Sequence, residues 1–131
     1  MDSIFKNFIK FILVGFVAFT SDITLYLVLI SYGWQTILAK ATGFIFGLII
    51  GYFLNSIFTF QKTAINQKRF FKYLLVYFCS LIANTLTNEY LINLFINSIN
   101  RDQAFLIAVI IATTVSLLMN FFGLRYYVFK N

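Results

Sequence analysis

Four long apolar stretches, separated by short polar segments, dominate the chain. They run over residues 8–31, 36–60, 70–96 and 104–129. Each is longer than the ~20 residues that an α-helix needs to cross the hydrocarbon core of a bilayer. The pattern therefore predicts an all-α membrane protein with four transmembrane helices, and these stretches leave no room for a soluble domain.

Small residues recur at every fourth position in the second and fourth stretches. They are Ala39, Gly43, Gly47, Gly51 and Asn55 in the second stretch and, 65 positions later, Ala104, Ala108, Ala112, Ser116 and Asn120 in the fourth. Positions four apart form one ridge of an α-helix, and small side chains there let a neighbouring helix backbone approach closely in lipid. We therefore expect both ridges to be packing surfaces, and we interpret the chain as a duplicated pair of helices.

Other matches extend this repeat but do not agree on its register. Residues 8–14 resemble residues 70–76 at an offset of 62, which pairs Asp22 with Asn84, whereas the ends of the second and fourth stretches correspond at an offset of 69. Each copy contains two spans, so both copies enter the membrane from the same side. The sequence therefore predicts two parallel helix-hairpin repeats, related by a pseudo-two-fold axis along the membrane normal.

Composition agrees with the membrane interpretation and excludes several kinds of chemistry. Apolar residues make up 61% of the chain and charged residues 11%, whereas an ordinary soluble domain is about 25% charged. Cys79 is the only cysteine and histidine is absent, so an intramolecular disulfide and a cysteine or histidine metal site are excluded, and we expect no cofactor. No nucleophile and base pair is visible, so we do not expect an enzyme.

Basic residues border the apolar stretches on one side. Eight of the ten are Lys6, Lys10, Lys62, Lys68, Arg69, Lys72, Arg125 and Lys130. By the positive-inside rule, both termini and the middle loop face the cytoplasm, and the turns at 31–35 and 97–103 lie outside the cytoplasmic membrane. These residues flank spans instead of following an exposed groove, so we expect contacts with membrane lipids and none with nucleic acid.

Ionisable side chains inside the spans are candidate functional groups, because each costs about 2.5–3.5 kcal/mol to insert. Asp22, Lys40 and Glu89 are of this kind, and their depths would let them meet within one leaflet. The alternatives are a structural ion pair in which Lys40 lies between the two acids or, for Lys40, extension to the outer interface. Asn84 and Asn88 make the third stretch polar, and such amides either bind sugar hydroxyls or join helices by hydrogen bonds.

Four segments together make the chain similar to a known family. They are residues 10–15 (KFILVG) followed by Asp22, 55–60 (NSIFTF), 69–73 (RFFKY) and 120–129 (NFFGLRYYVF). In this order and spacing they resemble the GtrA-like family of four-helix membrane proteins over nearly the whole chain. The family ends these helices with Asn-Phe-x-x-Asn-Arg-x-Trp-x-Phe. The first copy has Gly51 and Ser56 at the first Asn and the Arg, and the second copy has Leu124 and Tyr127 at the second Asn and the Trp.

The resemblance implies one GtrA-like transmembrane domain over residues 1–131, with repeats at about 8–62 and 70–130. It implies a role in cell-surface polysaccharide or teichoic-acid glycosylation, in which the protein flips a polyprenyl-phosphate-linked monosaccharide across the membrane. No motif for ATP binding is present to drive such transport. A membrane glycosyltransferase would be a further partner, and a homo-oligomer is left open.

Such a cargo needs cations or amide donors for its phosphate. Lys10, Lys72 and Arg125 could supply them on the cytoplasmic side, and Lys40 near the exit. Asn55 and Asn120 stand near the inner ends of the two ridges and would come together if the repeats are symmetric. These two amides are therefore the strongest candidates for substrate binding.

Two other functions fit the sequence. One is an accessory subunit that recruits or stabilises a membrane glycosyltransferase through the small-residue ridges. The other is an exporter like those of small multidrug resistance, in which Asp22 would bind cations or protons. Assays of dye transport and of lipid-sugar flipping separate these alternatives.

Overall fold

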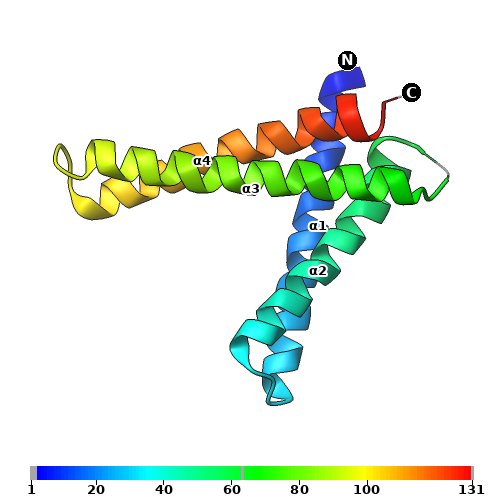
Figure 1. Cartoon of the computed structure of the whole chain (residues 1–131), viewed down its shortest axis with the longest axis horizontal. Coiled ribbons are helices and arrows are strands. Elements are labelled where there is room, and N and C mark those ends of the chain that lie inside the picture. Colours follow the sequence, from blue (N-terminus) through cyan, green and yellow to red (C-terminus); the bar gives the residue numbers. More distant parts are fainter. Residues whose placement is uncertain (1–2, 63, 131) are drawn as a thin grey trace. The chain divides into compact units, whose positions relative to one another are not determined.

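The computed structural model describes residues 3–62 and 64–130, which fold into long helices joined by short turns (Figure 1). In chain order the elements are α1 (Ser3–Ser31), α2 (Thr36–Leu54), η1 (Asn55–Thr59), α3 (Gln67–Phe95), α4 (Arg101–Gly123) and η2 (Leu124–Val128). The elements η1 and η2 are π-helical turns that continue α2 and α4 directly. Each of the four helices, taken with these turns, is long and apolar enough to cross a membrane. The predicted all-α fold with four membrane helices is confirmed.

The helices form two compact hairpins. In the first, α1 packs along α2, and in the second α3 packs along α4, with the boundary between Ile65 and Asn66. The first hairpin turns at 32–35, where Gly33 has a φ of 85°, a left-handed conformation that glycine adopts without strain. We call the turn between the two helices of a hairpin its closed end and the opposite end its open end.

The small-residue ridges are buried within the hairpins. Ala39, Gly43, Gly47 and Gly51 are buried on α2, and Ala104, Ala108 and Ala112 on α4. A Cβ atom at Gly43 would lie 2.7 Å from the main-chain oxygen of Asp22, and one at Gly47 would lie 2.9 Å from that of Ala18. The backbones of α1 and α2 therefore touch where glycine leaves room. The expectation that the ridges are packing surfaces is confirmed.

The two hairpins correspond at two offsets, one for each pair of helices. The buried rings of Phe11 and Tyr73, on α1 and α3, stand 62 residues apart. The buried rings of Tyr52 and Phe121, on α2 and α4, stand 69 apart, as do the starts of η1 and η2. The seven-residue difference between these offsets is taken up around the closed end, so the offset of 65 aligns α4 one helical turn out of step. The duplication itself stays a prediction.

Candidate functional site

In both hairpins a lysine near the open end lies over an aromatic ring of the π-helical turn. The Nζ of Lys10 is 4.9 Å from the ring centroid of Phe58, and that of Lys72 is 5.0 Å from the centroid of Tyr127. The two contacts are equivalent at the offsets of 62 and 69. Lys10 also donates a hydrogen bond of 3.2 Å to the carbonyl of Phe58, at the end of a helix where the dipole is negative. The ammonium group of Lys10 is therefore partly engaged within its own hairpin and has fewer N–H donors left for a ligand.

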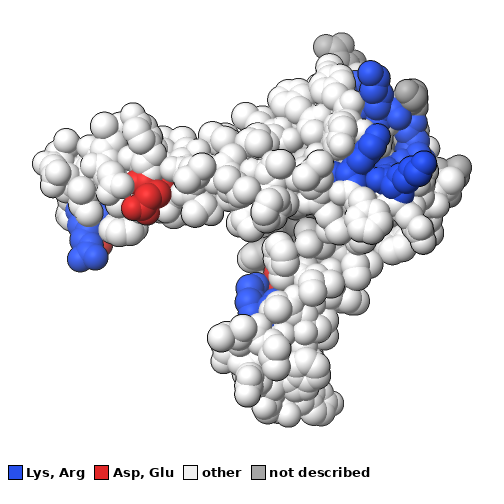
Figure 2. Space-filling view, viewed as in Figure 1, with Lys and Arg blue, Asp and Glu red and all other residues white. Residues whose placement is uncertain are grey.

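The open end of the second hairpin also holds guanidinium groups. The Cζ of Arg69 is 5.8 Å from the ring centroid of Phe129, and that of Arg125 is 5.6 Å from the ring of Tyr126. Arg125 takes the position that Ser56 has in the first hairpin, where the serine hydroxyl bonds a carbonyl of the following loop. Figure 2 shows basic side chains gathered around the open ends. A planar guanidinium group can donate two parallel hydrogen bonds to two oxygens of one phosphate. The arginines therefore make this end of the second hairpin a candidate phosphate-binding site.

Two buried polar atoms near this open end lack a hydrogen-bond partner among the described residues. They are the Nε of Arg125, a donor, and the Oδ1 of Asn120, an acceptor. An unpaired buried polar atom costs about 1–3 kcal/mol, so each of these atoms is a candidate contact for a water molecule, an ion or a ligand. The Oδ1 of Asn88, farther toward the closed end, is a third such atom.

The two strongest candidates from the sequence, Asn55 and Asn120, are not equivalent. Asn55 begins η1, is only 1% exposed, and accepts a hydrogen bond of 3.0 Å from the hydroxyl of Thr59. Asn120 lies four residues before η2, at the position that Gly51 has in the first hairpin. Because η1 and η2 start 69 residues apart, the two amides differ in their position relative to these turns. The two residues belong to different hairpins, and their approach to each other stays a prediction.

Asp22 and Lys40 form an ion pair between α1 and α2. The Nζ of Lys40 is 3.1 Å from both carboxylate oxygens of Asp22. Asp22 is buried, whereas half of the Lys40 side chain is exposed. The pair is complete within the first hairpin, which agrees with the structural alternative from the sequence. Glu89 belongs to the second hairpin, where it accepts a hydrogen bond of 3.3 Å from Asn93.

The second hairpin has a neutral contact at the corresponding place. The Nδ2 of Asn84 donates a hydrogen bond of 3.1 Å to the Oγ of Ser116. Asn84 corresponds to Asp22 at the offset of 62, and Ser116 corresponds to Gly47 at the offset of 69. Gly47 itself packs on Asp22. Ser116 was visible in the sequence only as a ridge residue, and its hydrogen bond joins α3 to α4.

The profile of the family described as GtrA/DPMS, transmembrane domain, matches residues 10–129. The chain belongs to this family. The finding confirms the GtrA-like membership expected from the sequence. No curated protein matches the chain. In this GtrA/DPMS domain the matched range includes the ion pair and both lysine contacts with aromatic rings.

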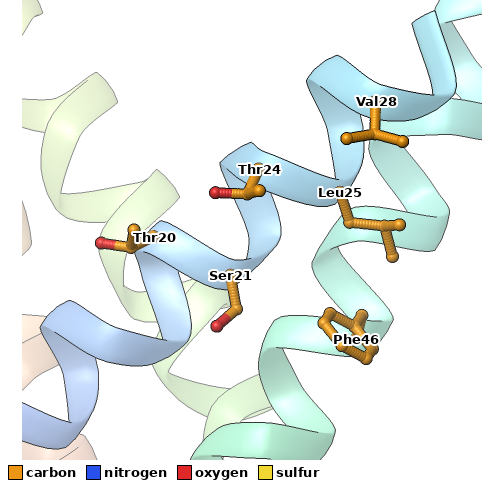
Figure 3. Close-up of a pocket in the computed structure, with 6 residues that line it drawn as sticks. All are labelled: Thr20, Ser21, Thr24, Leu25, Val28 and Phe46. Carbon is orange, nitrogen blue, oxygen red and sulfur yellow. The ribbon is translucent and has the colours of Figure 1, made fainter.

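The GtrA/DPMS domain also has a groove along α1 that the sequence interpretation missed. Its lining residues are Thr20, Ser21, Thr24, Leu25, Val28 and Phe46 (Figure 3). Thr20 and Ser21 donate hydrogen bonds to main-chain carbonyls one turn earlier, so their hydroxyls are satisfied without a ligand. The volume of about 280 Å³ lies just below the ~300–1,000 Å³ usual for ligand pockets. The spacing of Thr20 and Thr24 by four was the signal for this polar face.

The difference between the two amides gives a test of stability. We expect Asn55→Ala to lower the free energy of unfolding by about 1–3 kcal/mol, because the buried hydroxyl of Thr59 loses its acceptor. Asn120→Ala removes a buried oxygen that has no partner among the described residues, so we expect no loss of stability and a gain of up to about 1–3 kcal/mol. Unfolding in mild detergent, followed by circular dichroism, measures both. Equal losses for the two variants would contradict this assignment.

Proposed function

We propose that this GtrA/DPMS domain flips a polyprenyl-phosphate-linked monosaccharide across the cytoplasmic membrane, for the glycosylation of cell-surface polysaccharide or teichoic acid. The polyprenyl chain can stay in the lipid, so only the phosphate and the sugar require polar groups. One observation carries the proposal. At the open end of the second hairpin, the Nε of Arg125 and the Oδ1 of Asn120 are buried without partners among the described residues.

The chemistry of this end matches the head group of such a lipid. A guanidinium donates to phosphate oxygens, and an amide oxygen accepts from a sugar hydroxyl. Lys72 adds a positive charge over the ring of Tyr127. Lys10, by contrast, is engaged by a carbonyl of its own hairpin. We therefore assign the larger part in phosphate binding to the second hairpin.

The two alternative functions receive less support. In an exporter Asp22 would bind cations or protons, but both of its carboxylate oxygens are bonded to Lys40. An accessory subunit would use the small-residue ridges to hold a partner, but these ridges are buried within the hairpins. The proposal also keeps the protein outside the class of enzymes, because its candidate groups are suited to binding.

A flipping assay in sealed liposomes tests the proposal. Purified protein is reconstituted with a fluorescent polyprenyl-phosphate glucose, and an impermeant reductant measures how much of the probe remains in the outer leaflet. We expect nearly all of the probe to become accessible with protein, against half in liposomes without protein. A probe that stays half protected, with the protein folded and incorporated, would favour an accessory role.

The expected orientation has its own test, which uses single cysteines in a Cys79→Ser background. We expect Asn100→Cys, at the closed end of the second hairpin, to react with an impermeant maleimide added to intact cells. Ile65→Cys, in the loop between the hairpins, should react only after the cells are opened, because the basic residues around it hold that loop in the cytoplasm. The reverse pattern of labelling would overturn this topology.

A further inference from the structure

The side chain of Lys40 extends away from the nearer end of its helix. Lys40 is the fifth residue of α2, about 6 Å along the helix axis from Thr36. Side chains on a helix lean toward its N-terminus, which for α2 is the closed end. The ammonium of Lys40 instead reaches Asp22, whose main chain lies beside Gly43. It is therefore held beside a carboxylate that packs against Gly43, three residues farther from the closed end than Lys40 itself.

The closed end offers this ammonium a second position. Tyr32 and Trp34 are exposed in the turn there, and such aromatic residues favour the head-group region of a membrane. A lysine near the end of a span usually extends to that region, where water and lipid phosphates surround its ammonium. Asp22 takes two hydrogen bonds from Lys40, and an ammonium has three N–H donors. The Nζ of Lys40 also lies 5.7 Å from the ring centroid of Tyr26, so a lipid phosphate at the closed end would have to draw it away from this ring as well as from Asp22.

The second hairpin indicates that packing alone does not require a charged pair. There Asn84, the counterpart of Asp22, makes a neutral hydrogen bond to Ser116 that joins α3 to α4, and Val109 stands at the position of Lys40. A buried ion pair is often no more stabilising than a neutral replacement. The charges of Asp22 and Lys40 therefore call for another explanation, and the half-exposed ammonium provides one.

We propose that Lys40 is a docking side chain for the phosphate group of a membrane lipid at the closed end, and that Asp22 is the competing anion that holds it retracted. When the ammonium moves to a phosphate, it leaves the buried carboxylate of Asp22 without its partner, which is unfavourable. The carboxylate therefore weakens phosphate binding and makes it reversible, as transport requires. The phosphate would be that of the sugar-carrying lipid if the proposed function holds, or that of a bulk phospholipid.

Equilibrium binding to the purified full chain in detergent tests this inference. The probes are a fluorescent short-chain polyprenyl-phosphate glucose and the matching polyprenyl glucoside without phosphate. We expect Asp22→Asn to tighten the Kd for the phosphate probe about fivefold and Lys40→Gln to weaken it about fivefold. Adding Asp22→Asn to Lys40→Gln should then change nothing further, because no ammonium remains to be released. The glucoside should respond to none of these changes.

Ser116→Ala is the control, since it removes the interhelical hydrogen bond of Asn84, the counterpart of Asp22 in the second hairpin, and should leave the Kd unchanged. Lys40→Arg keeps the charge and should bind the phosphate probe. Melting temperatures identify any variant that fails to fold, and Lys40→Arg then carries the test. Affinities that stay within about twofold for both single variants, or equal effects on the glucoside, would overturn the proposal.

Competition identifies the source of the phosphate. Displacement of the probe by excess phosphatidylglycerol would indicate that Lys40 binds phospholipids in general, whereas displacement only by polyprenyl phosphate would indicate the cargo. Either result supports phosphate docking. If the protein flips the lipid but binding does not depend on Lys40, the proposed function stands and this inference fails. If binding depends on Lys40 but the protein does not flip the lipid, this inference stands and the proposed function fails.

Discussion

Replacing Gly47 with leucine is expected to separate α1 from α2 and to lower the free energy of unfolding by about 3 kcal/mol, at the upper end for an overpacked contact. Even a Cβ atom at Gly47 would lie 2.9 Å from the main-chain oxygen of Ala18 and 3.0 Å from the Cβ of Asp22. Neither neighbour can rotate away, since one is backbone and the other is fixed to it. Unfolding in mild detergent, followed by circular dichroism, measures the loss.

Gly15→Leu is the matched control for this change. Gly15 lies on α1, and a Cβ atom there would meet nothing within 4 Å. The same substitution therefore adds the same side chain without overpacking, and it improves helix propensity. We expect this variant to melt at or above the temperature of the parent. If both variants melt alike, the close approach of the two backbones does not limit stability.

Arg125→Gln is expected to reduce lipid-sugar flipping about 10- to 100-fold, which corresponds to the ~1.5–3 kcal/mol of a hydrogen bond to a charged group. The buried Nε of Arg125 has no partner among the described residues, so its removal breaks no hydrogen bond that holds the hairpin together. We therefore expect helix content and melting temperature to stay close to those of the parent. Initial rates of probe accessibility in sealed liposomes, at matched protein density, measure the effect.

Arg101→Gln provides the comparison for that assay. Arg101 begins α4 at the closed end and lies 5.7 Å from the ring centroid of Phe105, so it loses the same charge at the other end of the same helix. We expect its flipping rate to remain within about twofold of the parent. Equal losses in the two variants would mean that net charge, and not the buried guanidinium of Arg125, determines the rate.

The helices and their packing faces could be predicted because each depends on local sequence. An apolar run indicates a transmembrane helix when the helix it forms is longer than the bilayer core is thick. Residues four apart lie on one face of a helix. Gly43 and Gly47 are buried where their spacing predicted. The contact between Asp22 and Lys40 was one of three interpretations, and it forms because α1 and α2 pack within reach of the lysine side chain.

Other features could not be predicted because they depend on the path of the backbone. The π-helical turns η1 and η2 contain no proline, and their composition does not differ from that of an ordinary α-helix. The sequence therefore carries no signal for them. The starts of these turns stand 69 residues apart, which favours one of the three offsets already visible in the sequence, and at that offset Asn55 and Asn120 do not correspond. The direction of the Lys40 side chain could not be predicted either, because it depends on where Asp22 lies on the neighbouring helix.

The close contact between Asp22 and Gly43 has a consequence for the residues that can stand at position 43. A Cβ atom at Gly43 would come within 2.7 Å of the main-chain oxygen of Asp22 and 2.8 Å of its carboxylate oxygen, so the backbone of α1 excludes an alanine there in this geometry. The second hairpin has an alanine, Ala112, in the corresponding ridge. An alanine at position 43 would therefore require α1 and α2 to move apart, whatever residue stands at position 22.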